Sequence, residues 1–123
     1  EKAECIRTAG GAALNTVRVA MWAAPSPLRA AFIGAVGKDG NAELLMAAMH
    51  RVGVTPHLLY VADTPTAVCA SLVDTDSKQR SLVVSRGAAG LMTCEFLSTP
   101  EVLEAMSQAS VTYCTAFVLS TPP

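Results

Sequence analysis

The stretch Ala9-Gly10-Gly11-Ala12-Ala13-Leu14-Asn15 decides how the first part of this chain folds. Its two adjacent glycines can adopt positive φ and admit a ligand close to the main chain. The helix that follows begins with N–H groups that have no helical partner, and Asn15 adds an amide with both donors and acceptors to the first turn. Such a loop is typical either of an ordinary strand-to-helix turn, with Asn15 as a cap, or of a small-ligand site.

Composition limits the possible classes of function. The chain has 123 residues, of which 51% are apolar and 15% charged, enough for one domain with a single core. Its net charge of −1 gives no electrostatic footprint for nucleic acid or a membrane surface, so we expect neither as a partner. No apolar run reaches the length of a bilayer-spanning helix. The cysteines lack CxxC spacing and predict buried, reduced thiols in a cytoplasmic protein, with no metal site; they are Cys5, Cys69, Cys94 and Cys114.

Hydrophobic periodicity predicts alternating strands and helices along the chain. Leu14, Val17 and Met21 recur at helical spacing, and Asp39 stands where a second helix needs an N-cap. The expected elements are a strand end at 5–8, a helix at 13–24, a buried strand at 29–36, a helix at 39–52, strands at 57–62, 67–74 and 80–85, a helix at 99–109 and a strand at 111–118. Strand–helix–strand units around an antiparallel insertion predict an α/β fold with an added β section.

Some features that suggest chemistry have an ordinary structural interpretation. The run Gly87–Gly90 invites comparison with a phosphate-binding loop, but no Gly-Lys-Ser/Thr follows, so we interpret it as a strand-to-helix connection. His50 and His57 have no carboxylate or cysteine at catalytic spacing and are interpreted as surface residues. Leu82, Val84 and Val118 would be ordinary core residues in any α/β protein.

Four motifs stand in a fixed order. They are the Gly-Gly-Asn loop with its helix, a strand and G-x-D turn at 32–39, a Pro-Thr strand at 65–70, and a last pair of segments at 79–82 and 116–120. Together they resemble the ribokinase-type (PfkB) carbohydrate kinases and, within them, the adenosine kinase branch. The resemblance covers nearly the whole chain and implies a three-layer α/β/α fold. Ala42 and Ala67 depart from it, since the family has glycine at both positions.

The resemblance implies an activity, the ATP- and Mg²⁺-dependent phosphorylation of the 5′-hydroxyl of adenosine. In that family Gly11 and Asn15 would bind the ribose hydroxyls, with Gly10 shaping the loop. Arg80 matches an arginine that swings toward the transferred phosphoryl group, where it offsets developing charge. The residues that would line an apolar wall around the base are Leu82, Val84, Phe117 and Val118.

The resemblance also implies that part of the enzyme lies outside these residues. The family's general base belongs to a Gly-Ala-Gly-Asp motif, which the chain does not contain. We therefore expect residues 1–123 to be an internal portion of the kinase domain, lacking the N-terminal strands and the C-terminal half that binds ATP and Mg²⁺. Such a portion is expected to be inactive alone, within a full-length enzyme that is cytoplasmic and monomeric.

Two alternatives remain at this point. One is a sugar kinase of the same family, similar to ribokinase or fructokinase, although a small sugar would need a more polar lining than Leu82, Val84 and Val118 provide. The other is a small α/β module that binds a polyol through the Gly-Gly-Asn loop and catalyses nothing.

Overall fold

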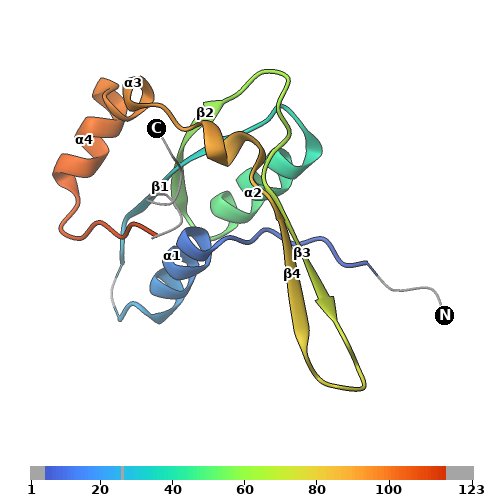
Figure 1. The fold of residues 1–123 in the computed structure, drawn as a ribbon. Coiled ribbons are helices and arrows are strands. Elements are labelled where there is room, and N and C mark those ends of the chain that lie inside the picture. The colour runs from blue at the N-terminus through green and yellow to red at the C-terminus, as the bar shows by residue number, and fades with distance from the viewer. Residues whose placement is uncertain (1–4, 26, 116–123) are drawn as a thin grey trace.

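The computed structural model describes residues 5–25 and 27–115. It is an α/β structure with one parallel and one antiparallel pair of strands, as the sequence predicted. Figure 1 shows the two pairs as separate parts, a body of strands and helices and a hairpin that projects from it. In chain order the elements are α1 (Ala12–Ala23), β1 (Ala30–Val36), α2 (Gly40–Arg51), β2 (Val54–Tyr60), β3 (Val68–Val73), β4 (Arg80–Ser85), the 3₁₀ helix η1 (Gly87–Leu91), α3 (Cys94–Leu97) and α4 (Pro100–Gln108).

The body is built on a strand–helix–strand unit. Strand β1 pairs in parallel with β2, from Ala30 opposite Val54 to Val36 opposite Tyr60. Helix α2 makes the crossover that parallel neighbours require. Strand β2 begins before the expected position and includes Pro56, whose missing N–H is tolerated because each strand of a two-stranded pair has a free edge.

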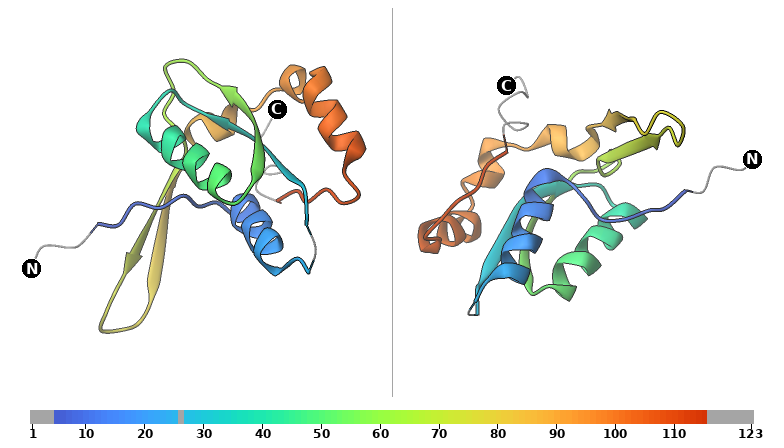
Figure 2. Two further views of the ribbon diagram at one scale, coloured as in Figure 1. Left: turned by 180° about the vertical axis from the view of Figure 1, so that it is seen from behind. Right: turned by 90° about the horizontal axis from the view of Figure 1, so that it is seen from below.

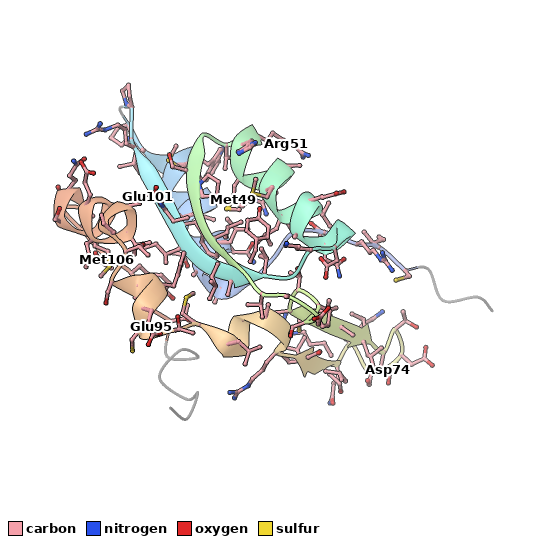
Figure 3. The ribbon with its side chains drawn as sticks, turned by 90° about the horizontal axis from the view of Figure 1, so that it is seen from above. Met49, Arg51, Asp74, Glu95, Glu101 and Met106 are labelled. Carbon is pink, nitrogen blue, oxygen red and sulfur yellow. The ribbon has the colours of Figure 1, made fainter. Side chains whose placement is uncertain are left out.

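The core lies where α1 and α2 cover one face of this strand pair. Leu14 of α1, Met49 of α2 and Val54 of β2 are buried together, and Figure 3 labels Met49 at this interface. Val17 and Met21 pack against the same cluster, so the predicted apolar face of α1 is confirmed. Figures 2 and 3 show α3 and α4 on the other side of the strands, which gives three layers.

The hairpin joins β3 to β4 in antiparallel register, from Val68 opposite Ser85 to Val73 opposite Arg80. Its turn is closed by Asp74, whose carboxylate accepts hydrogen bonds from the N–H of Asp76 (2.9 Å) and the hydroxyl of Ser77 (2.6 Å). Figure 3 labels Asp74 at the end of the hairpin that lies farthest from the body. Both strands are exposed along their whole length.

The exposure of the hairpin corrects one interpretation of its apolar side chains. Leu82 is 55% exposed and Val84 is 52% exposed, so neither is a core residue of the described structure. A strand pattern of alternating apolar residues indicates which side chains need cover, but it does not show what covers them.

Three further expectations are wrong. Residues 5–8 form no strand, and neither do residues 111–115; an extended segment needs a partner for its N–H and C=O groups to become part of a sheet. The rest of the strand expected at 111–118 lies outside the described residues. The cysteines are free but exposed, not buried; they are Cys5, Cys69, Cys94 and Cys114.

Within the described ranges, the helices are too short or too polar to cross a membrane.

Candidate functional site

The Gly-Gly loop leads directly into α1. Gly11 is the N-cap residue, with a φ of 99° that a glycine adopts without strain. The N–H of Asn15 donates to the carbonyl oxygen of Gly11 at 2.9 Å. Asn15 is therefore inside the first turn and is not the cap, which corrects the structural alternative. A Cβ on Gly10 or Gly11 would meet no atom within 4 Å, so the loop is open to an incoming molecule.

Ala9, at the start of the loop, fixes the loop to the body. Ala9 is buried beside Leu14 in the core of the body, and its carbonyl oxygen accepts a hydrogen bond from Nη1 of Arg18 at 3.4 Å. Asn15 is exposed, no side chain caps α1, and the first N–H groups of a helix have no partner within it. This combination can recognise vicinal hydroxyl groups, because each hydroxyl both donates and accepts a hydrogen bond.

A second cluster forms at the N-terminus of α2 around the carboxylate of Asp39. As predicted, Asp39 caps the helix, its Oδ1 accepting from the N–H of Ala42 at 2.9 Å. The same carboxylate accepts from the backbone N–H of Thr66 at 2.7 Å and from the hydroxyl of Thr66 at 2.8 Å. The hydrogen bonds from Thr66 and Ala42 lower the pKa of Asp39, because they stabilise the ionised form.

Thr66 is a buried polar residue, 6% exposed. Its Oγ1 accepts a hydrogen bond from the N–H of Gly37 at 3.0 Å while it donates to Asp39. Both roles of the hydroxyl are therefore used. The sequence predicted the cap but not the contact with Thr66. Its one hint was that Asp39 and Thr66 belong to consecutive motifs, the G-x-D turn and the Pro-Thr strand.

Two glycines allow the backbone to approach closely the segment that leads into β3. A Cβ on Gly37 would overlap the carbonyl oxygen of Thr64 and lie 2.9 Å from the nitrogen of Thr66. A Cβ on Gly87 would overlap the carbonyl oxygen of Pro65, which accepts a hydrogen bond from the N–H of Ala88 at 2.8 Å. We call the set Gly37, Asp39, Pro65, Thr66 and Gly87 the junction.

The predicted site residues of the hairpin share one face. Because side chains alternate along a strand, Arg80, Leu82 and Val84 project from the same side of β4. Arg80 begins β4 opposite Val73, at the turn end of the hairpin, whereas Thr66 of the junction precedes β3 at the other end. Phe117 and Val118, which were expected to complete the apolar wall, lie outside the described residues.

The structure therefore places the predicted site residues in two groups. Gly10, Gly11 and Asn15 belong to the body, and the face of Arg80 and Leu82 belongs to the hairpin that projects from it (Figure 1). The junction is the part of the described structure that joins the two.

A hollow of about 300 Å³ lies beside β2 and includes His57, Phe96 and Glu101 in its lining. His57 is half-buried there, which corrects its assignment to the surface. Within residues 5–25 and 27–115, no cluster of three or more His, Cys, Asp or Glu side chains is arranged to hold a metal ion.

Known proteins are similar to this chain in both sequence and fold. A family model described as pfkB family carbohydrate kinase matches residues 2–123. The adenosine kinase of Schizosaccharomyces pombe is 34% identical over 123 residues, which are 99% of this chain and 36% of that protein. The chain thus spans about a third of the length of the curated relatives it matches.

Two solved structures show the likeness in three dimensions. The adenosine kinase of Schistosoma mansoni, in complex with adenosine in an occluded loop conformation, has a TM-score of 0.82 and 27% identity, covering 91% of this chain and 32% of that chain. The adenosine kinase of Anopheles gambiae, in complex with P1,P4-di(adenosine-5) tetraphosphate, has a TM-score of 0.73 and 34% identity, covering 80% of this chain and 28% of that chain.

Proposed function

Since the chain belongs to the pfkB family of carbohydrate kinases, we propose that it is part of an adenosine kinase. The reaction is transfer of the γ-phosphoryl group of ATP to the 5′-hydroxyl of adenosine, giving AMP. The identity to the Schizosaccharomyces pombe adenosine kinase supports this substrate. The likeness to a structure solved with adenosine supports it as well.

The observation that carries the proposal is the open loop at the N-terminus of α1. Gly11 adopts a φ of 99°, no atom fills the space above the two glycines, and Asn15 presents an exposed amide from the first turn. In the proposed site the amide and the backbone of Gly11 bind the 2′- and 3′-hydroxyls of the ribose. Ala9, at the start of the loop, is buried in the core of the body. This packing keeps the binding groups in place before the nucleoside binds, which reduces the entropy lost on binding.

The hairpin supplies the second part of the proposed site. Leu82 and Val84 are exposed and apolar, as a surface that covers a purine ring must be. Arg80, two residues before Leu82 on the same face, carries a guanidinium that stabilises charge on the phosphoryl group as it is transferred. Phe117 and Val118 complete the apolar wall in this proposal.

The general base, ATP and Mg²⁺ belong to the rest of the enzyme in this proposal. The described residues present no acidic cluster for a metal ion, so they do not fit a Mg²⁺ site. We assign residues 1–123 to a partial kinase domain, without the N-terminal strands and the ATP-binding half. A cytoplasmic, monomeric full-length enzyme is part of the same proposal.

Equilibrium binding to the full-length protein tests the substrate. We expect adenosine to bind at least tenfold more tightly than ribose, because the base adds an apolar contact to the hydroxyl contacts that the two ligands share. Equal affinity for the two would favour a sugar kinase. No binding of either would contradict the proposed ribose loop.

A further inference from the structure

The hairpin is attached to the body at its base. Both of its strands are exposed throughout, and Figures 1 and 2 show it extending away from the helices. Helix η1, which follows the hairpin, packs against β1. The direction in which the hairpin points therefore depends on the residues at that base, which are those of the junction.

The junction attaches both ends of the hairpin to the same short segment, Pro65 and Thr66. On the side that enters β3, Thr66 is bound to the carboxylate of Asp39 through its N–H and its hydroxyl. On the side that leaves β4, the N–H of Ala88 donates to the carbonyl oxygen of Pro65 at 2.8 Å. Gly37 and Gly87 let these two attachments close on the same segment without a Cβ between them.

The geometry makes the tip sensitive to small changes at the base. From Thr66 to the pair of Val73 and Arg80 the hairpin spans roughly 23 Å, at about 3.3 Å per residue. A swing of about 5° at the junction then moves the tip by about 2 Å. A misplacement of about 1 Å can cost on the order of 100-fold in rate when a reacting group must be held in position.

We infer that Asp39 and Thr66 are positioning residues that set the direction of the β3–β4 hairpin and so bring Arg80 to the transferred phosphoryl group. This inference rests on the proposed function. Asp39 also caps α2, so the segment that enters the hairpin is hydrogen-bonded to the residue that begins this helix of the body. Neither residue touches the substrate; both act through Arg80.

The hydrogen bonds determine which substitutions retain the junction. Thr66→Ser keeps a hydroxyl that donates to Asp39 and accepts from Gly37, whereas Thr66→Val keeps the size and loses both bonds. Asp39→Asn cannot replace the carboxylate, because Oδ1 and Oδ2 each accept a backbone N–H, from Ala42 and Thr66, and an amide offers only one oxygen.

The test is a steady-state kinetic comparison in the full-length protein. We expect Thr66→Val and Asp39→Asn to lower kcat at least tenfold, with a smaller change in KM for adenosine, and Thr66→Ser to stay within about twofold of the parent. The matched control is Thr93→Val, which removes another hydroxyl that accepts a backbone N–H, that of Phe96 at 3.2 Å, and should leave kcat unchanged.

A double-mutant cycle separates positioning from a general loss of stability. If Thr66 acts through Arg80, Thr66→Val should cost little further kcat in an Arg80→Ala background. Full additivity of the two effects, or an unchanged kcat for Thr66→Val alone in an active parent, would overturn the inference and leave the proposed function intact. A full-length parent that does not phosphorylate adenosine would instead overturn the proposed function and this inference together.

Discussion

The carboxylate of Asp39 accepts two hydrogen bonds from Thr66, one from its backbone N–H at 2.7 Å and one from its hydroxyl at 2.8 Å, across a sequence separation of 27 residues. Because Asp39 also caps α2, one side chain ties the start of a core helix to the segment that leads into the hairpin. The parallel strand pair and the hairpin are thus connected through a specific polar contact in addition to the chain itself.

Because of this contact, we expect the free energy of unfolding to depend on pH in the acidic range. The hydrogen bonds from Thr66 and Ala42 hold the pKa of Asp39 below its ordinary value, which is about 3.9. A carboxyl whose pKa is lowered by folding stabilises the fold at pH values above the unfolded pKa, and that contribution is lost as the pH falls through the folded pKa. We expect the free energy of unfolding to fall less steeply below about pH 4 in Asp39→Asn than in the parent.

Denaturant titrations between about pH 2.5 and 7 measure this difference. Asp74→Asn provides a comparison, since hydrogen bonds from Ser77 and Asp76 also lower the pKa of Asp74. Those bonds are local to the turn and can persist in the unfolded chain, so the effect there should be smaller. Identical acid profiles for the parent and Asp39→Asn would contradict a role for the ionised carboxylate.

Gly37→Ala should destabilise the protein. The new Cβ would overlap the carbonyl oxygen of Thr64, and the nearest atoms are all backbone, which cannot move aside as a flexible side chain could. We expect a loss of about 1–3 kcal/mol in the free energy of unfolding, typical of overpacking. The control is Gly40→Ala in the first turn of α2, where a Cβ meets nothing within 4 Å and alanine should be neutral or slightly stabilising.

Asn15→Ala should weaken nucleoside binding. Loss of the amide removes hydrogen bonds to the ribose in the proposed site, which costs about 1–3 kcal/mol when the partner group is left unsatisfied. The measurement is KM and kcat for adenosine in the full-length protein. Gln108→Ala, which removes an amide from α4, should change neither. If KM and kcat are unchanged in Asn15→Ala, the assignment of Asn15 to the ribose is wrong.

Arg80→Ala should act mainly on kcat. A guanidinium that meets the phosphoryl group in the transition state contributes little to the ground-state complex, and losing one such donor typically costs on the order of 100-fold in rate. Arg51→Ala, at the C-terminal end of α2, is the control for loss of a surface charge. An effect confined to KM would mean that Arg80 binds the substrate without stabilising the transition state.

Much of the fold could be predicted because its signals are local. The cap at Asp39 and the apolar face of α1 each depend on a few neighbouring residues. The family resemblance and the α/β fold are confirmed by the family model and the solved structures.

The features that the sequence did not predict depend on distant residues. No local pattern reveals that Thr66 binds Asp39, because the two residues are 27 positions apart and meet only when the segment before β3 packs against the N-terminus of α2. Apolar runs likewise identify Leu82 and Val84 without showing whether anything covers them, and both are exposed. For the candidate site, the open Gly11 loop was predicted, whereas the junction that positions the hairpin was not.

The most direct test is the product formed by the full-length protein from ATP and a nucleoside. With ATP and Mg²⁺ supplied, adenosine should be converted to AMP in stoichiometric balance with ADP, and ribose at the same concentration should give at least tenfold less phosphorylated product. Phosphorylation of ribose at an equal or higher rate, or hydrolysis of ATP without AMP formation, would contradict the assignment to an adenosine kinase.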